Sequence, residues 1–145
     1  MAQTKGLLAT SEIDIKAPAS RVWQALTDPA MIRQYLFGTE VTSDWKEGSP
    51  ITYRGTWNGQ AYEDKGILEK IIPEKLLRST YWSSLSGTKD EPENYATISY
   101  TLSANGETTT LKLTQDNCST EESRAHSEKN WHVVLDTLKK LLEKE

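Results

Sequence analysis

The first segment of the chain alternates apolar and polar residues in the manner of a half-buried strand. In residues 7–16, the side chains of Ala9, Ser11, Ile13 and Ile15 fall on one side of an extended backbone, with polar or charged side chains on the other. Because successive side chains of a strand point to opposite faces, this alternation predicts a strand with one face toward solvent.

Residues 18–37 depart from this alternation and carry two helix-start signals. Pro18 stands where a first helical turn tolerates proline, because the backbone N–H is not needed there. Further on, Asp28 followed by Pro29 provides a carboxylate N-cap and a proline at the first helical position. We therefore expect two short helices with a corner between them, ending near Gly38.

Beyond residue 50, a period of two returns and continues for most of the chain. Asn58-Gly59 and Asn105-Gly106 stand between alternating runs, and Asn-Gly in that position is a strong signal for a β-hairpin. The polar, turn-rich residues 85–94 predict a longer loop, which we expect to be the most mobile loop of the sheet. The strands predicted by this pattern are residues 51–57, 61–72, 76–84, 95–103 and 107–115.

The last segment changes to helical spacing. Ser119, with Glu122 three residues later, fits a capping box at the start of a helix. The apolar residues that follow fall on one face of a helix, and charged residues fall on the other. This apolar stripe consists of Trp131, Val134, Leu135, Leu138, Leu141 and Leu142.

Together these elements predict an α+β fold in one domain, residues 1–145, which is the usual size of a single domain. We expect a curved antiparallel sheet of six or seven strands wrapped around the long C-terminal helix, with two short helices between strands 1 and 2. The C-terminal helix is the only element long enough to cover the sheet. A twisted sheet around a helix leaves space near its open end, which is a natural ligand site.

Composition narrows the classes of function. The chain has 17 Lys and Arg against 21 Asp and Glu, a net charge of −4, which argues against nucleic acid or an anionic membrane as a partner. No apolar run approaches the roughly 20 residues of a membrane span, so we expect no membrane insertion. The N-terminal residues lack the apolar stretch of a signal peptide, and the single cysteine, Cys118, leaves no internal disulfide. We therefore expect a cytoplasmic protein.

Four segments resemble one known family. Residues 15–29, which run from Ile-Lys-Ala-Pro to Trp-Gln-Ala-Leu-Thr-Asp-Pro, resemble its opening signature. Residues 66–69 and 73–77 are similar to its middle segment, and residues 131–138 to its C-terminal helix, where a Trp precedes a Leu-rich face. The family comprises single-domain relatives of the heat-shock-protein ATPase activator. It belongs to the START-like (SRPBCC) superfamily, which has the helix-grip fold of the birch-pollen allergen.

The resemblance implies three functions, which belong to different classes. The first is binding of a small hydrophobic or amphipathic ligand, such as a lipid, sterol, flavonoid or polyketide-like molecule, in a cavity between the sheet and the C-terminal helix. The second is a protein-interaction module of the chaperone-activator type, with a heat-shock chaperone as partner and a role in the stress response. The third is a cyclase-type enzyme, as in some relatives. We favour the first, although shared fold is a weak warrant for function.

The composition also suggests the walls of such a cavity. Five Trp and six Tyr accompany a single Phe, so nearly all large rings carry a polar group and suit a wall that meets a ligand. Tyr35, with Leu36 and Phe37, stands at the corner between helix and strand, where an entrance is expected, and residues 85–94 are a candidate gate. The predicted cavity residues are Tyr35, Tyr53, Trp57, Trp82, Tyr100, Leu113, Trp131, Leu135 and Leu138.

The sequence offers little for catalysis. His126 and His132 are six residues apart, about 240° on a helix, so they do not chelate one metal ion there. Cys118 is more typical of a small buried apolar residue than of a nucleophile. Glu63 and Asp64 are neighbours on a predicted strand and point to opposite faces, so they are not an acid–base pair. We therefore predict no catalytic residues, no metal site and no cofactor.

Overall fold

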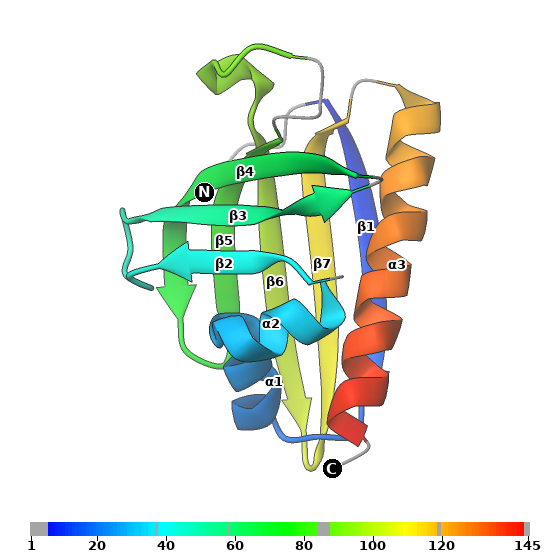
Figure 1. Ribbon diagram of the computed structural model, residues 1–145. Coiled ribbons are helices and arrows are strands. Elements are labelled where there is room, and N and C mark those ends of the chain that lie inside the picture. The colour runs from blue at the N-terminus through cyan, green and yellow to red at the C-terminus, as the bar shows by residue number, and fades with distance from the viewer. Residues whose placement is uncertain (1–5, 37, 58, 84–87, 119, 144–145) are drawn as a thin grey trace.

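In the part of the chain that the structure describes, seven strands and three α-helices form the α+β architecture that the sequence predicts (Figure 1). The computed structural model describes residues 6–36, 38–57, 59–83, 88–118 and 120–143, without the side chain of Trp57. The elements are β1 (Leu7–Ile15), α1 (Ala19–Thr27), α2 (Pro29–Tyr35), β2 (Glu40–Ser43), β3 (Pro50–Trp57), β4 (Gln60–Ile72), β5 (Leu76–Ser83), the 3₁₀ turn η1 (Pro92–Asn94), β6 (Ala96–Asn105), β7 (Thr108–Cys118) and α3 (Glu121–Glu143).

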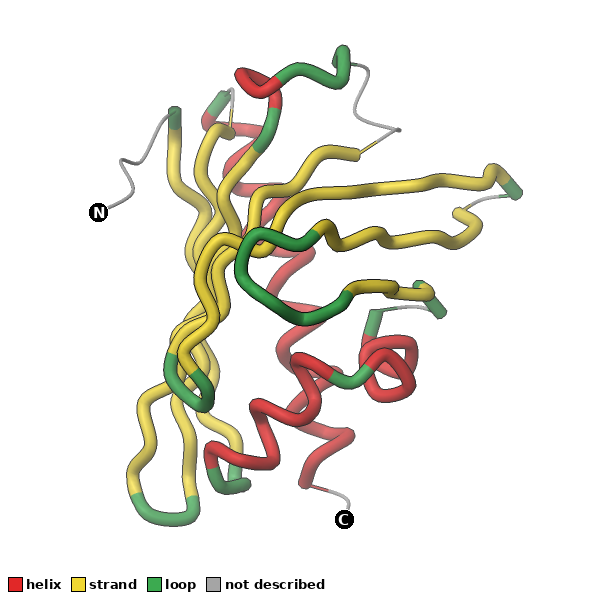
Figure 2. The backbone as a smooth tube through the Cα atoms, turned by 90° about the vertical axis from the view of Figure 1, so that its left-hand side faces the viewer, coloured by secondary structure: helices red, strands yellow, loops and turns green. Residues whose placement is uncertain are grey.

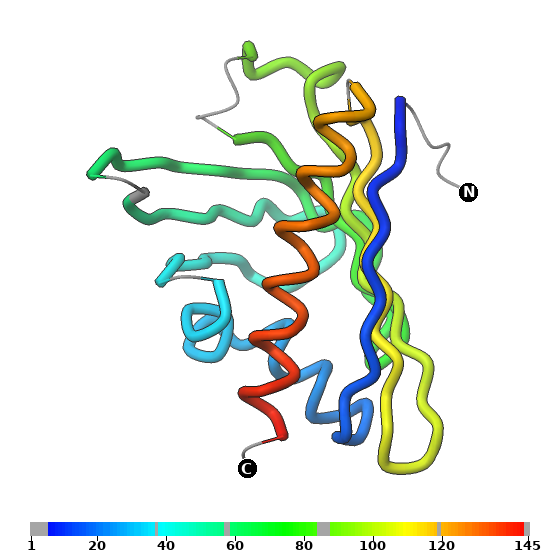
Figure 3. Tube along the Cα trace, turned by 90° about the vertical axis from the view of Figure 1, so that its right-hand side faces the viewer, coloured from blue at the N-terminus to red at the C-terminus, as the bar shows by residue number. Residues whose placement is uncertain are grey.

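The strands form one antiparallel sheet in the order β1-β7-β6-β5-β4-β3-β2. The sheet is strongly curved: β2, β3 and β4 turn away from the upright strands β1, β7 and β6 (Figure 2). All three helices lie on the inner side of this curve (Figure 3). Helix α3 runs alongside β1 and contacts it, and α1 and α2 lie at the end of the sheet opposite η1. The helix-grip architecture is therefore confirmed.

The core lies between the sheet and the helices. The buried face of α3 consists of Val134, Leu135, Leu138 and Leu142, as the helical stripe predicts, whereas Trp131 and Leu141 are only partly buried. Facing them, the sheet buries alternate residues of its strands. The largest fully buried side chains are Ile15, Val22, Leu68, Thr109, Leu111, Leu113, Leu135 and Leu138. Within the described residues, no helix is long and apolar enough to cross a membrane.

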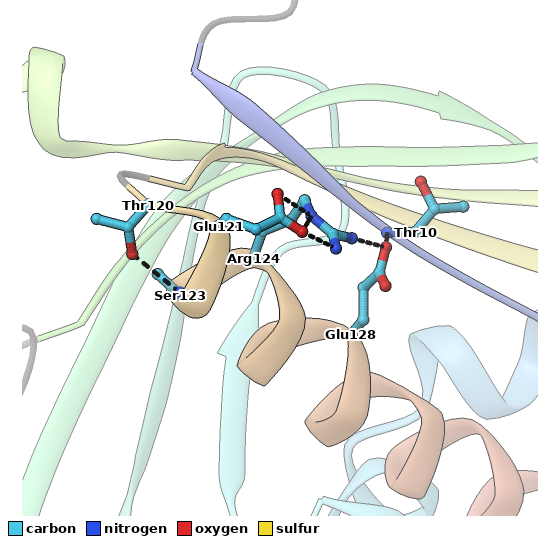
Figure 4. A network of polar contacts seen from close by, with 6 residues as sticks. All are labelled: Thr10, Thr120, Glu121, Ser123, Arg124 and Glu128. Atoms are coloured by element: carbon cyan, nitrogen blue, oxygen red, sulfur yellow. Dashed lines mark hydrogen bonds and ion pairs between the residues drawn. The ribbon is translucent and has the colours of Figure 1, made fainter.

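Polar contacts at the start of α3 attach it to β1 (Figure 4). Ser119, the predicted cap, lies outside the described residues; the Thr120 Oγ1 accepts a hydrogen bond from the Ser123 backbone N–H at 3.0 Å and so caps the helix. One turn further, the Arg124 guanidinium pairs with the Glu128 carboxylate at 2.6 Å. The same carboxylate accepts the Thr10 backbone N–H at 3.0 Å, which links the helix directly to the strand.

The structure contains one strand that the sequence pattern did not predict. Strand β2 has four residues and pairs only with β3, so it is an edge strand. Four residues are too few for an alternation to stand out against background. Of the predicted loop at residues 85–94, residues 85–87 lie outside the described part of the chain, and its last residues form η1.

Candidate functional site

A cavity of about 390 Å³ lies between the curved sheet and α3. Its walls come from β3, β4, β5 and β6 on the sheet side, from α3, and from the chain that follows α2. Curvature of the sheet makes this space, because β3 and β4 turn away from the strands that α3 covers. The lining residues are Leu36, Thr39, Tyr53, Thr56, Tyr62, Asp64, Tyr81, Ile98, Tyr100, Asn130 and Trp131.

Five aromatic residues stand among those that line the cavity. The rings of Tyr53 and Tyr81 meet edge to face with centroids 5.7 Å apart, and those of Tyr100 and Trp131 do so at 6.5 Å. The Trp131 indole Nε1–H donates to the Gln115 Oε1 at 2.6 Å, which fixes the orientation of the indole. The rings are therefore held in place by the protein itself and present a largely preformed apolar surface.

A buried carboxylate supplies the main polar feature of the cavity. Asp64 is only 7% exposed, and the Tyr81 phenol donates to its Oδ2 at 2.5 Å. Its other oxygen, Oδ1, is buried and has no hydrogen-bond partner among the described residues. Asp64 and Leu68 lie four residues apart in β4, and side chains an even number of residues apart in a strand point to the same face. Asp64 therefore points inward, as the fully buried Leu68 does.

A second polar pair lies on the cavity wall. The hydroxyls of Thr39 and Tyr62 are 2.6 Å apart and share a hydrogen bond. Tyr62 stands opposite Gly55 on the neighbouring strand, and a Cβ at Gly55 would come within 2.5 Å of the Tyr62 hydroxyl oxygen. Glycine at position 55 therefore leaves the space that the tyrosine ring occupies.

Three phenols of the cavity, those of Tyr53, Tyr81 and Tyr100, remain protonated well beyond neutral pH. Burial raises the pKa of Tyr53, Tyr81 and Tyr100 above the ordinary value of 10.0. For Tyr81, the negative charge of Asp64 raises the pKa further. Each of these hydroxyls therefore serves as a hydrogen-bond donor at physiological pH.

The structure brings three of the predicted cavity residues together and places others in the core. Tyr53, Tyr100 and Trp131 line the same cavity. The remaining apolar residues, Leu113, Leu135 and Leu138, are fully buried and pack in the core, outside the cavity lining.

The helix–strand corner contributes a different residue from the one expected. Tyr35 is buried, and its hydroxyl donates to the Ala25 carbonyl oxygen at 2.8 Å, which ties α2 to α1. Leu36, the next residue, lines the cavity instead. Phe37 lies outside the described residues.

The expected inward position of Trp82 needs correction. Leu77, Ser79 and Tyr81 occupy the inward parity of β5, so Trp82 has the opposite parity. Its ring stacks with Tyr95 at 6.4 Å, and the Nζ of Lys65, its cross-strand neighbour, lies 5.9 Å from the ring centroid. The side chain of Trp57, the other predicted tryptophan on the sheet, lies outside the described part of the structure.

Sequence reasoning missed the polar residues of the cavity. Asp64 was considered only beside Glu63, as a pair, and not for its own direction. Its parity with Leu68 in the predicted strand was the available signal, because an apolar residue four positions away on the same face indicates the core side. Asn130 had no such signal, because it precedes the apolar stripe of the C-terminal helix.

Cys118 and His126 line a second pocket, which shares Tyr81 and Asn130 with the cavity. Burial raises the pKa of the Cys118 thiol, which lowers its thiolate fraction. His126 Nε2 lies 3.1 Å from the Asn130 Nδ2 on the next turn of α3, away from His132. Among the described residues, no three His, Cys, Asp or Glu side chains are grouped as metal ligands.

Comparison with known structures finds the same fold in other proteins. The solution structure of ChR145 from Cytophaga hutchinsonii is 45% identical, with a TM-score of 0.84, and the match covers 99% of this chain and 97% of that one. The Aha1 dimer from Colwellia psychrerythraea is 24% identical, with a TM-score of 0.71 and coverage of 92% and 93%. DynU16, from the dynemicin biosynthetic locus, is 18% identical, with a TM-score of 0.78; the match covers 94% of this chain and 47% of that one.

Sequence comparison gives the family. No curated protein matches the chain significantly. The model of the family described as "Activator of Hsp90 ATPase homolog 1-like protein" matches residues 16–143, which include every helix and all strands except β1. The chain therefore belongs to the family of Activator of Hsp90 ATPase homolog 1-like proteins.

Proposed function

We propose that this protein binds a small hydrophobic or amphipathic molecule in the cavity between the sheet and α3. The observation that carries the proposal is the lining: five aromatic rings around one buried carboxylate, in a space of about 390 Å³. Ligand sites in proteins are of about this kind, with volumes of roughly 300–1,000 Å³, mostly apolar walls and a few placed polar groups. A core built only for stability would close such a space, because protein interiors pack densely.

The solved structures add one hint about ligand class. DynU16 shares this fold and comes from the dynemicin biosynthetic locus. We therefore include polyketide-type aromatics beside sterols, fatty acids and flavonoids as test ligands, because each offers an apolar body with few polar groups.

Tryptophan indole N–H signals in NMR spectra provide a direct test. Trp131 lines the cavity, whereas Trp82, which stacks with Tyr95, is not among the lining residues and serves as an internal control. Titration with a ligand that enters the cavity is expected to move the Trp131 indole signal saturably and to leave that of Trp82 in place. If no ligand class moves the Trp131 signal of the folded protein, the proposal is wrong.

Protein interaction is the second candidate function, and the family match favours it. In that case an outer surface does the work and no ligand is needed. Stimulation of a heat-shock chaperone ATPase by the full chain, unchanged by ligands that fill the cavity, would support this function over the first.

A cyclase-type activity stands third; it requires an acid or base in the cavity, and Asp64 with Tyr81 is the pair that meets this requirement.

A further inference from the structure

The charge of Asp64 has no counterion among the described residues. The neighbouring cations of β3 and β4 are paired elsewhere: Arg54 with Glu63 at 2.6 Å, and Lys65 with Asp90. The only hydrogen bond that the Asp64 carboxylate receives in the described structure comes from the neutral phenol of Tyr81. A buried carboxylate with one empty acceptor is unfavourable, and such groups in proteins are normally paired or fully hydrogen-bonded.

The rings beside Asp64 are suited to a positive charge. Tyr53 and Tyr81 are in contact with each other, and Tyr62 comes from the same strand as Asp64, two residues away. The faces of such rings carry negative electrostatic potential and attract cations within about 6 Å of the centroid. A carboxylate among aromatic rings therefore provides both a counterion and hydrogen-bond acceptors for an ammonium group, which carries several N–H donors.

The rest of the cavity suits an apolar body. Leu36, Ile98, Tyr100 and Trp131 line it without contributing a charge. A ligand that places a cation at Asp64 therefore finds apolar contacts for its remaining atoms in the same cavity.

We infer that the cavity selects amphipathic amines, with the protonated amine bound to the carboxylate of Asp64 and the apolar body against Ile98, Tyr100 and Trp131. This inference rests on the proposed function, because it names the ligand class of the same cavity. A neutral hydroxyl fills the free acceptor of Asp64 but leaves its charge uncompensated, so amines are expected to bind more tightly than the corresponding alcohols.

Three probes with one apolar body separate these contributions. They are 2-(1-naphthyl)ethylamine, 2-(1-naphthyl)ethanol and 1-ethylnaphthalene, which offer a cationic donor, a neutral donor and no donor. Binding is measured by titration, with the Trp131 indole signal as the report of position. The amine is expected to bind at least about tenfold more tightly than the hydrocarbon, since hydrogen bonds between charged groups are the strong ones.

Two matched variants locate the effect at Asp64. Asp64→Asn removes the charge and keeps the shape, so amine affinity is expected to fall about tenfold while hydrocarbon affinity is unchanged. Glu63→Gln makes the same change of charge one residue away, on a side chain that is 52% exposed and paired with Arg54, and should alter neither. Retained binding of the hydrocarbon shows that Asp64→Asn still folds. A third variant, Tyr81→Phe, keeps the carboxylate and frees both of its oxygens, so it should bind the amine at least as tightly as the wild type.

The outcomes distinguish this inference from the function on which it rests. If the three probes bind equally, or if Asp64→Asn binds the amine as the wild type does, the amine preference is wrong and binding in the cavity stands. If the alcohol binds as tightly as the amine and both lose affinity in Asp64→Asn, the anchor serves neutral donors and the inferred class is wrong. If no probe and no ligand of the wider panel moves the Trp131 signal, both the inference and the proposed function fail.

Discussion

Trp131 shows how a residue at a cavity differs from a residue in the core. It is only partly buried although it stands on the apolar stripe of α3, whereas Leu138 on the same stripe is fully buried. We expect Trp131→Ala to lower the free energy of unfolding by about 2 kcal/mol, below the roughly 3–5 kcal/mol typical of buried large aromatics. Leu138→Ala is expected to lower it by about 3 kcal/mol, despite the smaller side chain. Urea unfolding measures both; a larger loss for Trp131→Ala would mean that this ring packs as core.

The buried phenols give a pH dependence with a definite sign. The pKa of Tyr35, Tyr53, Tyr81 and Tyr100 is raised in the folded protein, with burial as the main cause. Because the phenol pKa is higher in the folded protein, the phenols of the unfolded chain lose their protons at a lower pH than those of the native protein. The free energy of unfolding is therefore unaffected by these groups below about pH 10 and falls as the pH rises further. Phenolate absorbance should therefore appear at higher pH in the native protein than in urea. Coincident titration of all six tyrosines in both conditions would contradict the burial of these rings.

The cavity residues were predictable only where the sequence shows which face of a strand a side chain points to. Tyr53 and Tyr100 alternate with polar residues in clear strands, so their inward direction follows from the sequence. Trp82 was predicted on the wrong face of β5, because this strand carries two adjacent aromatic residues, Tyr81 and Trp82. The size of the two rings does not tell which one faces inward. Asp64 was missed because a carboxylate at an inward position contradicts the usual pattern, and such exceptions tend to mark functional positions.

At the scale of elements, α3, which supplies one wall of the cavity, is attached to β1. The Glu128 carboxylate accepts the Thr10 backbone N–H and pairs with Arg124 (Figure 4). Glu128→Ala is expected to lower the free energy of unfolding by about 1 kcal/mol, because a partly buried N–H loses its acceptor. Hydrogen exchange at the Thr10 amide should become faster.

The control for this prediction is an exposed ion pair of the same helix. Asp136 pairs with Lys140 at 3.0 Å, and their side chains are 41% and 73% exposed. Asp136→Ala should change stability by less than about 0.5 kcal/mol, because exposed pairs contribute little. If both variants behave alike and exchange at Thr10 is unaltered, Glu128 does not hold the helix to the strand.

The elements themselves followed from the sequence where the signals were long or chemically specific. Asp28-Pro29 begins α2 as predicted, with the Asp28 Oδ1 accepting the Ala30 N–H at 3.0 Å. The predicted hairpin between β6 and β7 turns at Gly106, whose φ of 67° suits glycine. Strand β2 escaped because its four residues depend on pairing with β3, a tertiary contact that no local pattern displays.

At the scale of the whole molecule, one geometric feature joins fold and function. The curvature that turns β3 and β4 away from the upright strands separates Tyr53 and Asp64 from α3, and the side chains of the helix do not fill the space between them. The size of that space was beyond sequence analysis, because it depends on the bend of the sheet and not on the identity of any single residue. The cavity is therefore a property of the assembled fold, and its chemistry is set by the few residues that face it.

The most direct measurement is the set of intermolecular nuclear Overhauser effects between the protein and a bound amphipathic ligand, with 2-(1-naphthyl)ethylamine as the probe. Our account predicts contacts from the naphthalene protons to the rings of Tyr53, Tyr100 and Trp131, which line one cavity. Contacts only to Trp82 and Tyr95, which do not line that cavity, or saturable binding without contacts to the cavity rings, would contradict binding in the cavity.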